Sequence, residues 1–188
     1  MVPEAPLEST ETGIVQAGPG WFVVSARDAR WLYAEGRGGK CSFGDDDHFP
    51  QVGVNLWVLA KGEAMGLYHW EADQEDFLVL EGEALLLVEG EERPLRRWDF
   101  VHCPPGTKHI IVGAGDEPCL VLAVGAREHQ DTPEWGGYTV DDVATRRSVA
   151  VVEETTDPQK AYAHVSPRQP TRAHAGWLRD ERSAARGA

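Results

Sequence analysis

The feature that most constrains this chain is a succession of short β-type segments between residues 21 and 126. Aliphatic and aromatic side chains dominate these segments, and turns rich in glycine or proline, such as 81–83 and 104–106, separate them. No helical period lies between them. Many short strands joined by tight turns predict a β-sandwich or a small β-barrel. The expected strands are 21–24, 54–59, 66–71, 77–80, 84–88, 100–103, 110–112 and 119–124.

The two ends of the chain differ from this central region. Residues 1–20 are rich in proline, glycine, glutamate and threonine, which predicts a flexible amino-terminal arm. Residues 127–188 carry the helix signals together with several aromatic side chains. We therefore expect a β-barrel over 21–126, followed by a partly helical extension that packs on the barrel or on a partner subunit.

Two helix starts are recognisable in the extension. Thr139 resembles an N-cap, followed by Asp141 and Asp142 in the first turn. Asp157 followed by Pro158 is the usual pairing of an N-cap with proline at the first helical position, and it predicts a short helix to about residue 164.

The charge balance limits the partners. The chain has 18 Lys and Arg against 31 Asp and Glu, a formal net charge of −13. Proteins bind nucleic acids non-specifically through cationic side chains, so this chain is not expected to bind a nucleic acid. From residue 166 onward there are five arginines, Arg168 among them, against two acids, and this local excess predicts a solvated terminus.

Compartment and membrane association follow from composition and from the first residues. No apolar run approaches the roughly 20 residues that a membrane-spanning helix needs. The start has no basic segment followed by an apolar one, so no secretory signal is expected. Cys41, Cys103 and Cys119 form no C-x-x-C pair and are expected to be buried thiols in a reducing compartment. These features predict a cytoplasmic protein without membrane contact.

Four side chains form the main candidate site. His69 and Glu71 are two residues apart, so on a strand both leave the same face. Glu75 follows after a gap that suits a tight bend, and His109 comes directly after the turn at 104–106. Two imidazoles and two carboxylates that converge would form a four-ligand site for a divalent transition metal.

In this all-β context, the two motifs resemble those of the cupin superfamily, whose patterns are G-x5-H-x-H-x3,4-E-x6-G and G-x5-P-x-G-x2-H-x3-N. The positions that match are His69, Glu75 and Gly82 in the first motif, and Pro104, Gly106 and His109 in the second. The departures are Glu71 at the second histidine, Trp98 at the second motif's leading glycine, Gly113 at its closing asparagine, and Gly62 one residue out of place. The resemblance covers about residues 50–125. The sequence of this segment is similar to that of uncharacterised bacterial single-domain cupins.

The resemblance implies a double-stranded β-helix, or jelly roll, with His69, Glu75 and His109 as metal ligands. We add Glu71 as a fourth ligand, and the alternative is that Glu71 points to solvent and leaves three. Two glutamates would neutralise one divalent ion per chain, and oxygen donors favour manganese or iron, with zinc and nickel possible. Glu71 or Glu75 could also act as a general base.

Cupins carry many functions, so the reaction stays open. The favoured hypothesis is a metal-dependent enzyme that acts on a small molecule, with dioxygenase-like chemistry ahead of isomerase or lyase chemistry. The alternative is a non-catalytic module that binds a metal or a small molecule. The family's habit of pairing predicts a homodimer.

Three further features have less specific interpretations. Trp57 is either a cavity-lining or a core residue. His102 is expected to be a buried, hydrogen-bonded histidine behind the ligands. Residues 45–48, Asp-Asp-Asp-His, are expected to form an acidic loop.

Overall fold

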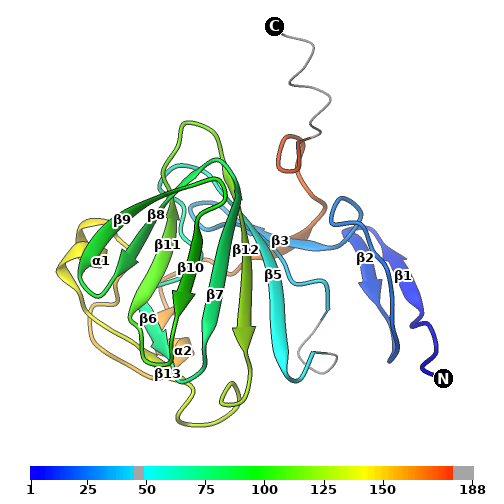
Figure 1. The fold of residues 1–188 in the computed structure, drawn as a ribbon, viewed down its shortest axis with the longest axis horizontal. Helices are drawn as coiled ribbons and strands as arrows, with labels where there is room; N and C mark the ends of the chain where they lie inside the picture. Colours follow the sequence, from blue (N-terminus) through cyan, green and yellow to red (C-terminus); the bar gives the residue numbers. More distant parts are fainter. Residues whose placement is uncertain (45–48, 180–188) are drawn as a thin grey trace, which may run out of the picture.

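Two antiparallel sheets face each other and enclose the centre of the protein (Figure 1). The computed structural model describes residues 1–44 and 49–179, and the elements below belong to these residues. The larger sheet has the order β10 (Phe100–Cys103), β7 (Glu75–Glu81), β12 (Cys119–Ala126), β5 (Val52–Leu59), β4 (Gly38–Cys41), β3 (Trp31–Ala34) and β14 (Gln169–Thr171). The smaller has the order β13 (Gly136–Tyr138), β6 (His69–Glu71), β11 (His109–Gly113), β8 (Glu83–Val88) and β9 (Glu91–Arg96). The chain is thus mostly β, with the jelly-roll arrangement that the sequence predicted.

Alternation along the strands builds the core between the sheets. On β12, Cys119, Val121 and Ala123 are buried, whereas the residues between them are half-buried on the outer face. Because side chains of a strand point alternately to its two faces, one face of each sheet supplies the core. The expected strands from 54 to 124 therefore overlap β5, β6, β7, β8, β10, β11 and β12.

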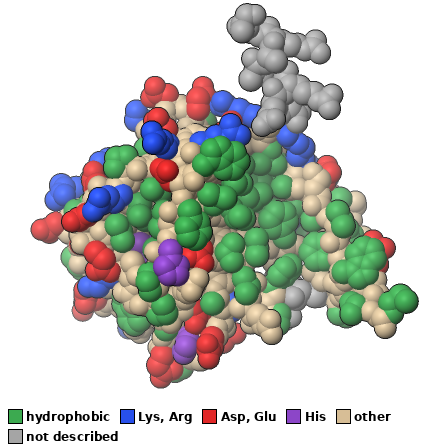
Figure 2. Space-filling view, in the orientation of Figure 1, with side chains coloured by type: hydrophobic (Ala, Val, Ile, Leu, Met, Phe, Trp, Pro, Cys, Tyr) green, Lys and Arg blue, Asp and Glu red, His purple; other side chains and the backbone are tan. Residues whose placement is uncertain are grey.

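The outer face of the larger sheet carries a row of apolar side chains. Phe100 pairs with Leu78, Leu78 pairs with Leu122, and Leu122 pairs with Leu56 across four adjacent strands. These residues are half-buried or exposed. Figure 2 shows hydrophobic side chains gathered over β7, β12 and β5. A contiguous apolar surface of this kind is typical of an interaction face.

The amino-terminal segment differs from the sequence-based expectation. Instead of an irregular arm, β1 (Leu7–Thr10) and β2 (Gly13–Gln16) form an antiparallel hairpin beside the larger sheet (Figure 1). The strand expected at 21–24 is absent from the described residues, where Trp21 and Val23 are exposed. Trp21 makes only an isolated parallel bridge with Glu4, so β-type composition alone did not produce a strand here.

Residues after 127 cover the barrel of their own chain. β13 extends the smaller sheet beside β6, and β14 extends the larger sheet beside β3. Near the carboxyl end, the ring of Trp177 packs 5.1 Å from that of Trp31 and lies over Gly39. Since a glycine has no side chain, Gly39 leaves room for this ring.

Both expected helices exist, with corrected limits. Asp141, and not Thr139, caps α1 (Asp142–Arg146), because its carboxylate accepts hydrogen bonds from the backbone amides of Val143 and Ala144. Thr139 is buried. Asp157 caps α2 (Pro158–Ala161) as expected, although the helix ends at 161 and does not continue to 164.

Two further observations bear on the sequence-based expectations. Cys41, Cys103 and Cys119 are free and buried. Within the described residues, none of the helices has the length and apolar character needed to cross a membrane.

Candidate metal centre

Two neighbouring strands of the smaller sheet bring the candidate histidines together. His69 on β6 is the register partner of His109 on β11, and the centroids of their rings lie 5.1 Å apart. A turn precedes β11, in which Gly106 adopts a φ of +83° and donates its backbone N–H to the carbonyl of Glu71. Glycine adopts this left-handed conformation readily. The turn therefore fixes the start of β11 against the end of β6.

Both imidazoles are oriented in the same way. The Nδ1 atom of His69 lies 2.8 Å from the carbonyl oxygen of Leu67, and that of His109 lies 2.9 Å from the carbonyl oxygen of Thr107. A carbonyl only accepts hydrogen bonds, so each Nδ1 carries the hydrogen and, in a neutral ring, Nε2 has the free lone pair. This is the usual arrangement of a metal-binding histidine with its supporting hydrogen bond.

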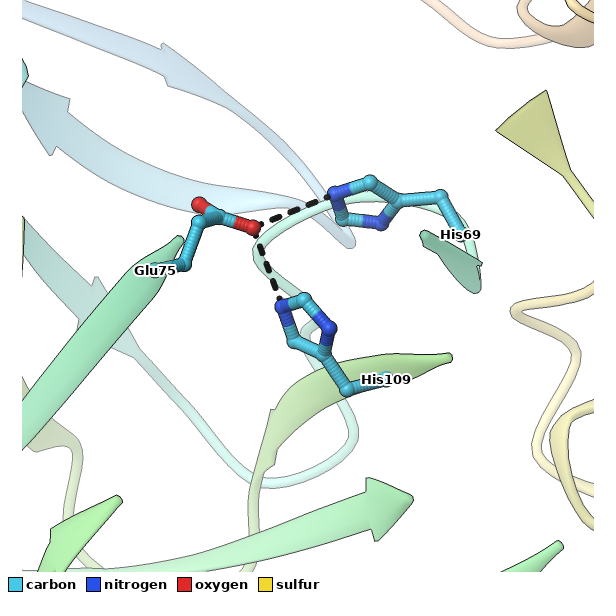
Figure 3. A group of neighbouring side chains, drawn as sticks. All are labelled: His69, Glu75 and His109. Atoms are coloured by element: carbon cyan, nitrogen blue, oxygen red, sulfur yellow. Dashed lines mark ion pairs between the residues drawn. The ribbon is translucent and has the colours of Figure 1, made fainter. Parts of the chain in front are cut away.

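Glu75 approaches from the opposite sheet, at the start of β7. Its Oε2 atom lies 3.1 Å from Nε2 of His109 and 3.7 Å from Nε2 of His69. Figure 3 shows that the same carboxylate oxygen faces both rings. The candidate ligand atoms of these three residues all lie within 4.8 Å of one another. Three donors that converge in this way match the nitrogen and oxygen ligands of a divalent transition metal.

Two of the three donor atoms are unsatisfied. Oε2 of Glu75 and Nε2 of His109 are buried and make no hydrogen bond within the described part of the chain, although they are 3.1 Å apart. Buried polar atoms are nearly always paired, and an unpaired one needs an explanation such as an ion. A bound cation would satisfy both atoms, so the residues present fit a metal.

The electrostatics of the triad favour charged groups. Burial by itself raises the pKa of Glu75, but contact with His109 and the nearby charges of His69, His109 and Lys40 outweigh it and lower that pKa. Burial lowers the pKa of His109, but Cys103 and Glu75 together outweigh it and raise that pKa. The carboxylate is thus held in the ionised form that a metal requires.

Glu71 lies beside the triad rather than within its closest group. Its Oε1 atom is 3.5 Å from Nε2 of His69, and its side chain is the more exposed of the two glutamates, at 29% against 17% for Glu75. The spacing argument for a shared strand face was therefore sound. Glu71 is not among the residues whose ligand atoms all lie within 4.8 Å.

The triad opens into a cavity of about 420 Å³ inside the barrel. This volume lies within the range of about 300–1,000 Å³ that is usual for small-molecule sites. Trp57 lines the cavity, and the Nζ atom of Lys40 lies 5.3 Å from the centroid of its ring. Tyr138 also lines it, with its ring 6.0 Å from that of His69. Trp57 also belongs to the buried core, so both interpretations of this residue hold.

Sequence reasoning missed the cationic side chains of the cavity. Among the described residues that line it, four are cationic and three are acidic. The cations are Arg37, Lys40, Arg127 and Arg168, and the acids are Glu71, Asp73 and Glu75. The expectation that Arg168 belongs to a solvated terminus is wrong, because β14 docks against β3 and carries the preceding arginine into the barrel. No motif marks these residues, and only the fold brings them together.

Two other candidates lie elsewhere. His102 is not buried behind the ligands: it is on the outer face of β10, half-exposed, with Nδ1 2.7 Å from Oδ1 of Asp76. Alternation along β10 sends it away from the cavity. The acidic run 45–48 lies outside the described residues.

A family comparison agrees with this architecture. The family model described as "Cupin domain" matches residues 55–125, which contain the triad and the strands from β6 to β11 with most of β5 and β12. Residues 55–125 form a cupin domain.

Related proteins resemble parts of this chain. An uncharacterised protein of Methanocaldococcus jannaschii is 26% identical over 77 residues, which are 40% of this chain and 62% of that protein. A putative sugar phosphate isomerase from Acidithiobacillus ferrooxidans is 26% identical over 48% of this chain and 60% of its own, with a TM-score of 0.42. A cupin 2 conserved barrel domain protein from Salinispora arenicola is 31% identical over 39% and 61%, with a TM-score of 0.37. The cupin thus spans about three fifths of the length of these relatives.

Proposed function

We propose that this cupin is a metal-dependent enzyme that acts on a small molecule held in the barrel cavity. The observation that supports it is that Oε2 of Glu75 and Nε2 of His109 are buried without a hydrogen bond among the described residues and, 3.1 Å apart, both face Nε2 of His69. His69, Glu75 and His109 would hold one divalent transition metal. Such an ion supplies a Lewis acid or, as iron or manganese, a redox centre.

The protein's own residues have distinct parts in this proposal. The backbone carbonyls of Leu67 and Thr107 hold the two imidazoles with Nε2 toward the cavity. Glu75 stays ionised and supplies the negative ligand. Glu71 is outside the closest group, more exposed, and next to His69, so we assign it the role of proton acceptor from the substrate.

Elemental analysis of purified protein without an affinity tag tests the metal. We expect close to one transition metal per chain in the wild type and little in His109→Ala. His102→Ala is the matched control, because His102 is a histidine on the outer face, and it should keep the metal. Absence of metal from the wild type, even after incubation with manganese, iron, zinc or nickel salts, would refute the proposal.

Glu71→Gln separates the two roles of that carboxylate. If Glu71 accepts a proton, the variant keeps its metal. If Glu71 is a fourth ligand, metal content falls as well, and the assignment as base is wrong. A bound metal whose coordination is saturated by protein atoms, without exchangeable water, would indicate a non-catalytic binding module instead of an enzyme.

A further inference from the structure

Two arginines of the cavity are held entirely by neutral groups. Nη2 of Arg168 donates to the carbonyl oxygens of Arg37 and Met65, at 2.6 and 3.0 Å, and its guanidinium lies 4.7 Å from the centroid of the Trp57 ring. The guanidinium of Arg37 lies 4.7 Å from the centroid of the Tyr162 ring, and its Nη1 donates to the carbonyl of Ser166 at 3.2 Å. Backbone carbonyls and aromatic faces thus fix both guanidiniums in place.

Neither arginine is within 4.0 Å of a carboxylate among the described residues. This is unexpected in a chain with 31 Asp and Glu against 18 Lys and Arg. Arginines on the outside do pair, as Arg147 does with Glu92 and Arg179 with Glu117. A partly buried charge without a counter-charge is unfavourable unless something else supplies one.

The two guanidiniums also act on each other. Burial and the positive charge of Arg37 together lower the pKa of Arg168 to about 10, against smaller opposing effects of Tyr162 and Glu63. Arg168 is still protonated at neutral pH, so two like charges share one wall of the cavity that contains the metal triad. An anion bound there would relieve this repulsion and receive charge-assisted hydrogen bonds from the guanidinium N–H groups that the backbone carbonyls leave free.

We propose that Arg37 and Arg168 form a subsite for an acidic group, a carboxylate or a phosphate, on the small molecule that this cupin takes into its barrel. The inference rests on the proposed function in one respect, namely that the part of the bound small molecule beyond its acidic group reaches the metal triad. It also gives the extension after residue 127 a role: β14 pairs with β3 and so holds Arg168 in the cavity wall.

Titration calorimetry on the full-length protein, freed of metal by a chelator, tests the subsite with two probes. Inorganic phosphate and malonate represent the two acidic groups, and the tighter of them identifies the group preferred. We expect both Arg37→Met and Arg168→Met to weaken binding by about ten- to a hundredfold, as expected for a lost hydrogen bond between charged groups. Arg168→Lys keeps the charge without the planar fork and should bind at an intermediate level.

The matched control is Arg172→Met. Arg172 belongs to the same carboxyl-terminal segment and likewise donates to backbone carbonyls, those of Glu11 and Thr10, but it does not line the cavity. Its affinity for both probes should equal that of the wild type. If Arg168→Met fails to fold, Arg37→Met and Arg168→Lys still decide the question.

The outcomes separate this inference from the proposed function. Unchanged affinity in Arg37→Met and Arg168→Lys, or no binding to the wild type, would overturn the subsite. Binding that requires added metal, disappears in His109→Ala and ignores the arginines would also overturn it, while supporting the metal centre. Arginine-dependent binding by a protein that takes up no metal would support the subsite and refute the enzyme.

Discussion

The contact between Gly39 and Trp177 allows a sharp test of how the carboxyl-terminal segment is held. A Cβ atom added at Gly39 would lie within 3.0 Å of three carbons of the Trp177 ring. Such a separation is too short, so Gly39→Ala must displace the ring from Trp31. We expect the substitution to destabilise the protein through this displacement alone.

The magnitude follows from the burial of Trp177. Replacing a core tryptophan by alanine costs about 3–5 kcal/mol, and Trp177 is only half-buried, so Trp177→Ala should cost about 2 kcal/mol. Gly39→Ala can cost at most about that amount. In the Trp177→Ala background the clash is gone, and alanine in place of glycine within β4 should instead stabilise by about 0.5–1 kcal/mol.

Urea denaturation followed by circular dichroism measures all four proteins of this double-mutant cycle. A coupling free energy of about 1–3 kcal/mol between the two positions is expected. In thermal melts, each kcal/mol corresponds to about 2–4 °C for a chain of this size. Equal destabilisation by Gly39→Ala in both backgrounds would show that the ring does not pack on Gly39, and the docking of this segment would have to be reconsidered.

Three other predictions concern the rest of the molecule. Asp141→Ala should lower the free energy of unfolding by about 1 kcal/mol, since it removes the N-cap of α1; no change in a urea titration would contradict the cap. Burial raises the pKa of Cys119 to about 11. The thiolate fraction at pH 8 is therefore about a hundredfold below that of a thiol with a pKa of 9.0, and it rises only as the pH approaches 11. Reaction of Cys119 with a thiol reagent should require unfolding, and rapid labelling of this residue in the native protein would contradict the prediction. We also propose that two copies of the chain pair through the apolar row on the larger sheet. Light scattering should then show a homodimer for the wild type and for Val23→Lys, a change at an exposed site elsewhere, but a monomer for Leu122→Lys. A wild type that is already a monomer would refute the pairing.

Much of the fold could be predicted because alternation and turn chemistry are local. The apolar residues of β7, β8, β11 and β12 recur at the spacing of strands, and glycine- or proline-rich turns separate them. The short strands β3, β4, β13 and β14 were not predicted. β4, β13 and β14 carry weak signals of their own and exist because a neighbouring edge supplies their hydrogen bonds, whereas β3 has an apolar, aromatic sequence that could have indicated it.

The sequence by itself determined which residues could share a face. The spacing of His69 and Glu71 places both on one side of β6, and the turn before His109 sets the start of the adjacent strand. These are consequences of backbone geometry over a few residues, so they could be read without the structure.

Only the tertiary structure decided what meets across the barrel. Glu75 joins the two histidines because the larger sheet curves toward the smaller one, while Glu71 lies outside that closest group. Arg37 and Arg168 reach the same cavity from positions 131 residues apart, since β14 pairs with β3. Distances across a barrel depend on how distant strands pair and curve together, and no local pattern in the sequence specifies this.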